Sequence, residues 1–186
     1  MSARYAGLPR AFNLSAAGYF LDFVLMPPAA GALFAFAIDA TGGSIALAWC
    51  VAGVMLWQAF EYAIHRVLFH AFAPLARMHD IHHANPKGFV GVASWLTFVG
   101  FGATFGVIAV LAGVPAAAAC VAGILLGYLF YCAIHIRMHH GDRARLWRYT
   151  RFMRELHAAH HRGGDGNFGV SSPLFDLIFR TYRPVR

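Results

Sequence analysis

The sequence predicts an all-α integral membrane protein, a bundle of about four transmembrane helices with a cytoplasmic cap rich in histidine. Of its 186 residues, 59% are apolar and 12% are charged, which is about half the charged share of a typical water-soluble domain. Residues 88–136 include no Asp, Glu, Lys or Arg, and residues 11–65 include only Asp22, Asp39 and Glu61. Since a helix needs about 20 apolar residues to cross a bilayer, these stretches suffice for several crossings.

We expect four spans, at roughly 17–38, 44–64, 92–112 and 115–134. The third and fourth form a hairpin, because Gly113-Val114-Pro115 is a turn signal between two apolar runs. The first span carries Pro27-Pro28 and is expected to be kinked, shallow or re-entrant. A cleaved signal peptide is an alternative interpretation of that first apolar run.

Basic residues give the expected orientation. All fifteen Lys and Arg lie in 1–10, 66–87 and 137–186, so the positive-inside rule places both termini and the cap segments, 65–91 and 135–186, in the cytoplasm of a single membrane domain, 1–186. This distribution accounts for the net charge of +7 without nucleic-acid binding. Only one of the fifteen basic residues is Lys, a composition typical of a high-GC bacterium, which would place the protein in the inner membrane.

The eleven histidines are the chemically informative residues. They fall into four clusters, each just after an expected span or within a cap segment: His65 and His70; His79, His82 and His83; His135, His139 and His140; His157, His160 and His161. Residues three and four apart share a helix face, so each His-x-x-His-His triplet projects three imidazoles to one side. Positions five apart lie about 140° apart on an ideal helix, so the helix is expected to bend or end between His65 and His70, near Phe69.

Neutral imidazole binds iron, zinc, copper and nickel. About ten imidazoles at one locus exceed the needs of one ion, and two ions with about five ligands each would use them. An oxygen-activating enzyme, a metal transporter and a metallopeptidase are the candidate classes. The common peptidase motif His-Glu-x-x-His is missing from the sequence, and a transporter would place its ligands within the spans and not at their ends.

Five segments then carry a family resemblance: 61–70, 79–86, 131–140, 157–161 and 167–176. In order and spacing they resemble the fatty acid hydroxylase and sterol desaturase superfamily of membrane di-metal oxygenases. The last segment, Asn-Phe-Gly-Val-Ser-Ser-Pro-Leu-Phe-Asp, is most similar to the fatty acid 2-hydroxylase branch, which hydroxylates the carbon next to the carboxyl carbon of long acyl chains. A carotenoid or sterol hydroxylase or desaturase is the alternative within the superfamily, and a structural or transport-related metal-binding protein is the alternative outside enzymes.

The resemblance implies an O2-dependent monooxygenase with two iron ions, although zinc can occupy such sites in purified protein. It implies a lipid acyl substrate within the bilayer and ten ligands: His65, His70, His79, His82, His83, His135, His139, His157, His160 and His161. Side chains that could orient these imidazoles are Glu61, His140, Asp80, Asn85 and Asn167.

Electrons would come from a separate protein, because the sequence has no evident haem, flavin or iron–sulfur motif. Arg148, Arg151 and Arg154 are spaced three apart and form a basic stripe leading to His157. We expect this stripe to dock an acidic ferredoxin or cytochrome b5-like donor. Binding to anionic lipid headgroups is an equally good explanation of the same arginines.

Overall fold

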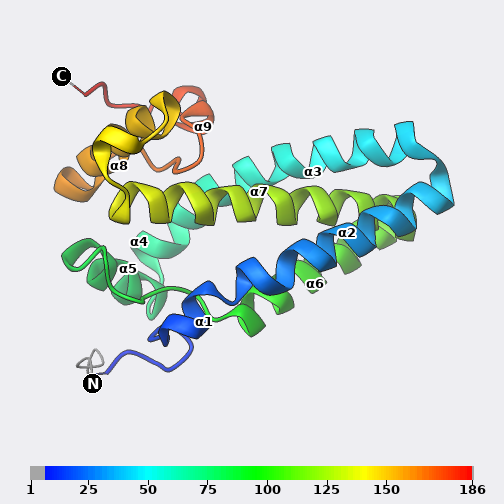
Figure 1. Cartoon of the computed structure of the whole chain (residues 1–186), viewed down its shortest axis with the longest axis horizontal. Coiled ribbons are helices and arrows are strands. Elements are labelled where there is room, and N and C mark those ends of the chain that lie inside the picture. The colour runs from blue at the N-terminus through cyan, green and yellow to red at the C-terminus, as the bar shows by residue number, and fades with distance from the viewer. Residues whose placement is uncertain (1–6, 186) are drawn as a thin grey trace. The chain divides into compact units, whose positions relative to one another are not determined.

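The protein is all-helical, as predicted. The computed structural model describes residues 7–185, and within them the only strand-like pairing is one isolated β-bridge, Asn13 with Val90 (Figure 1). The chain divides into two compact units, one of Met1–Trp57 and Phe89–Leu129, the other of Gln58–Gly88 and Phe130–Arg186. Two of the three boundaries fall inside long helices, and the third, at residues 88–89, lies in a segment between helices.

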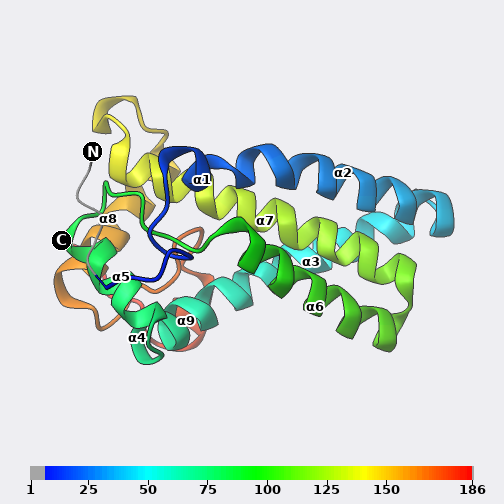
Figure 2. The same cartoon turned by 90° about the horizontal axis from the view of Figure 1, so that it is seen from below.

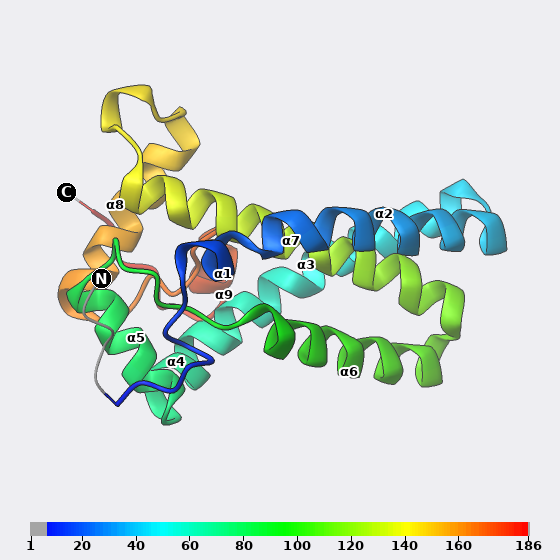
Figure 3. The same cartoon turned by 60° about the horizontal axis from the view of Figure 1, so that its bottom comes forward.

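The first unit consists of long apolar helices. It contains α1 (Ala16–Phe20), α2 (Asp22–Thr41), α6 (Ser94–Ala112), and most of α3 (Gly43–Ala63) and α7 (Val114–His140). Helices α6 and α7 form the predicted hairpin, joined at Gly113, whose φ of +90° lies in the region that glycine adopts without strain (Figures 2 and 3). The turn signal in the sequence is therefore confirmed.

Helices α3 and α7 cross at two glycines. A Cβ at Gly53 would lie 1.9 Å from the Cys120 carbonyl oxygen, and a Cβ at Gly123 would lie 1.9 Å from the Cys50 carbonyl oxygen. Only a residue without a side chain fits at either point, so the two backbones are in direct contact. In a membrane the hydrophobic effect does not drive helices together, and helices commonly pack there by close backbone approach at small residues.

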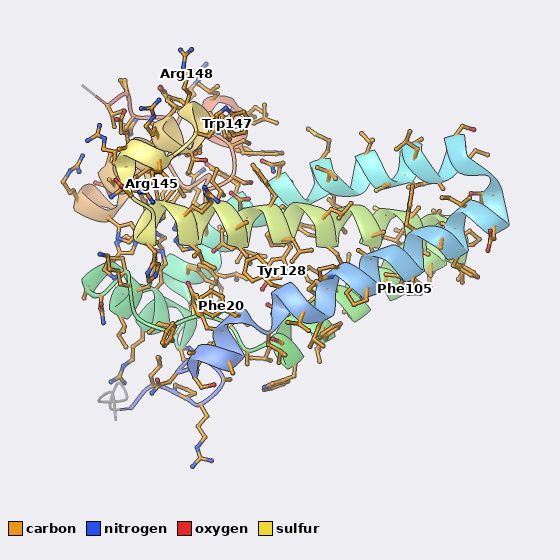
Figure 4. All side chains as sticks on the ribbon, viewed as in Figure 1. Phe20, Phe105, Tyr128, Arg145, Trp147 and Arg148 are labelled. Carbon is orange, nitrogen blue, oxygen red and sulfur yellow. The ribbon has the colours of Figure 1, made fainter. Side chains whose placement is uncertain are left out.

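The double proline does not break its helix. Pro27 and Pro28 lie inside α2, and the discontinuity in this segment lies instead at Leu21, between α1 and α2. Asp22, the first residue of α2, is buried, and its carboxylate accepts a hydrogen bond from the Tyr128 hydroxyl of α7 (Figure 4). The helix is interrupted at Leu21, ahead of the prolines, and the expected kink at the prolines themselves stays a prediction.

The second unit holds every histidine. It contains the end of α3, η1 (Ile64–Leu68), α4 (Phe69–Ala71), α5 (Leu75–Ala84), the end of α7, η2 (Arg143–Arg145), α8 (Arg148–Gly163) and α9 (Leu174–Ile178). Figure 1 shows the end of α7 lying between α5 and α8. These three helices and η1 supply the side chains described below.

Helix α8 is amphipathic and forms because its apolar positions recur every three to four residues. Its buried residues are Thr150, Met153, Leu156, His157 and His160. Met153 and Leu156 pack with Ile134, Met138 and Val170 in the core of this unit. The same face that carries the core carries two of the histidines, so packing of α8 fixes where their rings point.

The second span, expected to stop near Phe69, ends two residues later, at Ala71, so the helix does not end between His65 and His70. Residues 64–68 form a π-helical turn, η1, and the helix continues through Ala71. Because π-helical hydrogen bonds join residues five apart, the turn brings His65 and His70 one above the other. Their rings are stacked, with centroids 5.6 Å apart.

Among residues 7–185, four helices are long and apolar enough to cross a membrane, as predicted: Ala16–Thr41, Gly43–Ala71, Ser94–Ala112 and Val114–His140. The second and fourth extend six or seven residues beyond the predicted spans. Each extension carries histidines, because the helix continues past the point at which the apolar pattern stops.

Candidate metal centre

Nine of the ten predicted ligands form two groups. The first, the four-histidine group, is His65, His79, His83 and His160; the second, the five-histidine group, is His82, His135, His139, His157 and His161. Within each group, one nitrogen from every ring lies within 4.8 Å of the others. The sequence predicts a shared locus, and the structure divides it into two.

Each triplet contributes to both groups, in opposite proportions. On α5, His79 and His83 join the four-histidine group and His82 joins the five-histidine group; on α8, His157 and His161 join the five-histidine group and His160 the other. The helix explains the division, since positions i+3 and i+4 are about 100° apart around its axis while i and i+4 are only about 40° apart. The His-x-x-His-His spacing thus directs its three imidazoles toward two adjacent groups and not toward a single one.

The nitrogens of the five-histidine group cannot be satisfied by hydrogen bonds alone. The Nε2 atoms of His135, His139 and His157 form a triangle with sides of 2.9, 3.0 and 3.1 Å. A ring nitrogen is either a hydrogen-bond donor or an acceptor. Among three nitrogens that all lie close together, at least two must therefore be both donors or both acceptors, and such a pair cannot form a hydrogen bond. Three lone pairs directed at one cation remove that conflict.

The nitrogen spacings also indicate the coordination geometry. Metal–nitrogen bonds of about 2.1 Å place two ligands about 3.0 Å apart at a right angle and about 3.4 Å apart at the tetrahedral angle. Nε2 of His161 lies 2.9 Å from Nε2 of His157, and Nε2 of His65 lies 2.9 Å from Nε2 of His79. Each of these spacings is closer to the right-angle value than to the tetrahedral one.

Buried nitrogens without partners provide a further test of fit. Nε2 of His82, His83 and His160 is buried and has no hydrogen-bond partner among the described residues. Such atoms are destabilising unless something else binds them. All three belong to the two groups, so the residues fit a pair of metal ions.

Burial favours the neutral form of the histidines on α5 and α8, and the neutral form is the one that binds metal. Burial, reinforced by neighbouring imidazoles, lowers the pKa of His161 to about 3, and burial lowers the pKa of His160 to about 4 although a hydrogen bond to the Gly166 carbonyl opposes the change. The pKa values of His79 and His157 are lowered further, again mainly by burial. At neutral pH these rings carry lone pairs and not charge.

The remaining two histidines are both exposed, and they differ in position. His70 belongs to neither group, but its ring lies beside the four-histidine group, with centroids 4.6 Å from that of His79 and 5.2 Å from that of His160. His140 lies outside both groups. Its neighbour His139 is in the five-histidine group.

The other predicted supporting residues separate by burial. Asp80 and Asn85 are exposed on α5 and at its end, whereas Glu61 and Asn167 are buried. Glu61 accepts hydrogen bonds from the backbone N–H groups of Val170 and Ser171, at 2.6 and 2.7 Å. The Asn167 side chain bonds the backbone of Arg183 in both directions.

Two groups that hold imidazoles have no signature in the sequence, because they are backbone carbonyls. The Gly166 carbonyl oxygen lies 2.9 Å from Nδ1 of His160, and the Phe168 carbonyl oxygen lies 2.5 Å from Nδ1 of His65. Each carbonyl accepts the Nδ1 proton, so each ring presents the lone pair of Nε2. The Asn-Phe-Gly motif marks this segment without revealing that role.

The fold and the two histidine groups define an all-α protein with helices long and apolar enough to span a membrane and two adjacent polyhistidine groups that could hold metal ions near the ends of two of them. The family model for fatty acid hydroxylase matches residues 50–181, and the chain belongs to that family. It is 31% identical over 147 residues to the dihydroceramide fatty acyl 2-hydroxylase FAH2 of Arabidopsis thaliana and 32% identical over 153 residues to the fatty acid 2-hydroxylase of Rattus norvegicus.

Those alignments cover 72% and 76% of this chain but 60% and 41% of the relatives' lengths. The chain therefore spans less than two thirds of the length of these curated relatives. A solved structure of full-length scs7p, in which only the hydroxylase domain is visible, superimposes with a TM-score of 0.80 at 26% identity, covering 91% of this chain and 69% of that one.

Proposed function

We propose that the protein is a membrane-bound di-metal oxygenase that hydroxylates the acyl chain of a lipid, with carbon 2 as the favoured position. The observation that carries this proposal is the pair of adjacent histidine groups, because nine imidazoles in two groups suit a pair of redox metal ions more than a single closed structural site. Relatives named as fatty acid or dihydroceramide fatty acyl 2-hydroxylases supply the substrate class.

Iron is the proposed metal at both positions. Structural zinc sites are tetrahedral and four-coordinate, and zinc has no redox chemistry, whereas the nitrogen spacings here favour right angles. Bound iron would supply the redox step with O2. One oxygen atom of O2 enters the C–H bond and the other leaves as water, with two electrons and two protons consumed.

The place of the histidines along the spans supports oxidation near the lipid headgroup. His65 lies near the end of the span Gly43–Ala71, and His135 and His139 lie near the end of the span Val114–His140. The ends of a span lie at the membrane surface. In an acyl lipid the carbons at that depth are those next to the head, and carbon 2 is among them.

The chain's own contribution is to hold and orient the imidazoles. Burial favours the neutral form of His160, and the Gly166 and Phe168 carbonyls fix the ring protons of His160 and His65 on Nδ1. Each fixed ring needs no reorientation when metal binds. The aliphatic and aromatic side chains of the spans offer a lipid-like path for the acyl chain.

We further propose that α8 docks an acidic electron donor, of the ferredoxin or cytochrome b5 type. Arg148 and Arg151 are exposed, and Figure 4 shows the Arg148 side chain extending away from the ribbon. Both lie near the N-terminus of α8, where the helix dipole disfavours positive charge, so their placement costs stability and favours a binding role. Arg154 is less available, because it donates to the Gly141 carbonyl at 3.0 Å.

Lipid analysis under isotopic oxygen tests the proposed activity. Cells that produce the protein are grown under 18O2 and their acyl lipids are compared with those of cells that produce His139→Ala. We expect 2-hydroxyacyl lipids, heavier by one 18O atom, only with the unaltered protein. Labelled carotenoids or sterols would instead establish the other branch of the superfamily, and unchanged lipids with bound metal would favour a structural or transport role.

A further inference from the structure

Residues 166–171, which we name the strap, connect α8 to the turn before α9. Two strap carbonyls, of Gly166 and Phe168, bond Nδ1 of His160 and His65. Both of these histidines belong to the four-histidine group. The strap therefore orients ligands of one metal position.

Two buried carboxylates hold the strap by its backbone. The N–H groups of Phe168 and Gly169 donate to the two oxygens of Asp176, at 2.9 and 2.7 Å, and the next two N–H groups, of Val170 and Ser171, donate to Oε1 of Glu61. Four consecutive backbone donors are thus bound by two carboxylates. Hydrogen bonds to ionised groups are about twice as strong as neutral ones, so the strap has little freedom to shift.

The carboxylates are themselves fixed. Glu61 and Asp176 are 4% and 1% exposed. The Ser171 hydroxyl also donates to Glu61, and the Thr181 hydroxyl donates to Asp176 at 2.7 Å. Glu61 stands four residues before His65, so one helical turn carries both a ligand and the anchor of the carbonyl that orients it.

The strap also cannot relax at Gly169. A Cβ there would lie 2.0 Å from the Ser172 carbonyl oxygen and 2.9 Å from Asp176 Oδ2. At Gly169 the backbone therefore lies against the Asp176 carboxylate with no room for a side chain. This close contact helps to fix the direction of the adjacent Phe168 carbonyl.

The five-histidine group is held differently. Its ligands come from the regular helices α5, α7 and α8, and four of its Nε2 atoms contact one another directly. Nδ1 of His157 is buried without a hydrogen-bond partner among the described residues. The His157 ring therefore has no backbone carbonyl on Nδ1 among the described residues, whereas the His65 ring has the Phe168 carbonyl.

We propose that Asp176 and Glu61 are positioning residues for the four-histidine group alone, so that the two metal positions are inequivalent and one empties without the other. This inference rests on the proposed pair of metal ions and adds an asymmetry that follows from the strap. Altered outer hydrogen bonds typically weaken metal binding about 10- to 100-fold.

Metal analysis of purified Asp176→Asn tests this inference without any activity measurement. The amide replaces one acceptor oxygen by a donor, so one strap N–H loses its partner. We expect the metal content to fall from two equivalents toward one, and chelator to remove one ion at least tenfold faster than the other. Asp39→Asn, the same change at an exposed residue of the other unit, should keep two equivalents.

Combined variants show which ion is lost. Asp176→Asn added to His160→Ala should remove no further metal, because both act on the same ion. Added to His139→Ala, it should leave the protein nearly metal-free. Equal loss of both ions in Asp176→Asn, or two ions released at the rates of the unaltered protein, would overturn the proposal.

Folding is followed by gel filtration and circular dichroism. If Asp176→Asn does not fold, Ser171→Ala replaces it; this variant removes one hydroxyl bond to Glu61 and should speed release of the same single ion. Unaltered protein with two ions but no hydroxylated lipid would refute the proposed function and leave this inference standing. Unaltered protein with one ion would refute the inference itself.

Discussion

At the scale of single residues, the triangle of Nε2 atoms distinguishes a metal site from a cluster of hydrogen-bonded histidines. His139 takes part in two of its three contacts, at 2.9 and 3.0 Å. His140, the next residue, is exposed and outside both groups. Adjacent histidines of identical chemistry thus have opposite environments.

This contrast gives a matched pair of variants. His139→Ala should lower the metal content of protein purified without chelator by about one equivalent, since it removes a ligand with two close neighbours. His140→Ala should leave it at two equivalents. Elemental analysis by plasma mass spectrometry measures both, and equal loss in the two variants would show that the contacts do not mark ligands.

The lowered pKa values predict how metal-free protein responds to acid. Well above pH 6.5, the ordinary pKa of histidine, His160 and His161 are neutral in both the folded and the unfolded chain. Below that pH the unfolded chain takes up protons that the folded His160 and His161, with pKa values of about 4 and 3, do not. The free energy of unfolding should therefore decrease as pH falls from 6.5 to about 4, by up to about 1.4 kcal/mol per pH unit for each such histidine.

Tryptophan fluorescence during thermal unfolding in detergent measures this effect. The midpoint should be constant between pH 8 and 7 and fall steadily below 6.5, and bound metal should raise it at every pH. A midpoint independent of pH down to 4.5 would mean that the rings are accessible to protons in the folded protein.

At the scale of elements, the crossing of α3 and α7 depends on the missing side chains of Gly53 and Gly123. Gly53→Ala should push the helices apart, because the new Cβ meets the Cys120 backbone oxygen and carbon at 1.9 and 2.8 Å. We expect a loss of about 1 to 3 kcal/mol, the usual cost of overpacking. Gly106→Ala on α6, with nothing within 4 Å of its Cβ, is the control and should unfold at an unchanged midpoint in the same detergent.

The exposed arginines of α8 lead to a second prediction at the scale of elements. Arg148→Glu combined with Arg151→Glu should slow turnover that depends on a protein donor by about tenfold and weaken its salt dependence, because long-range attraction to an acidic partner is lost. Metal content should not change. Lys87→Glu, which reverses another exposed basic charge, should turn over normally; normal rates in the double variant at all ionic strengths would assign the stripe to lipid headgroups.

The sequence allowed the four helices and the histidines to be predicted, because apolar runs and imidazole clusters leave a direct pattern. Three features left none. The π turn at His65 changes the angle between residues five apart without altering composition. The division of each triplet between two ions depends on where neighbouring helices lie. The carbonyls of Gly166 and Phe168 belong to a backbone that every residue shares, so only the folded strap reveals them.

At the scale of the whole molecule, the orientation in the membrane stays a prediction from charge. Tags at Arg186 and in the 70–77 segment should report the cytoplasm, and a tag at 40–43 should report the opposite side, because every Lys and Arg lies in the expected cytoplasmic segments. Glycosylation or cysteine-labelling reporters measure each position. Opposite results at Arg186 and 70–77 would divide the histidine ligands between two compartments and exclude a shared centre.

The opposite division of the two triplets has a consequence for how the protein is made. Each metal position takes ligands both from α5 and from α8, and α8 leaves the ribosome only after the third and fourth spans have been synthesised. A nascent chain that ends before α8 therefore has an incomplete set of ligands at both positions. If the two groups hold the proposed ions, a complete set of ligands forms only after α8 has been synthesised, and we expect delivery of the ions to be a late step of biogenesis.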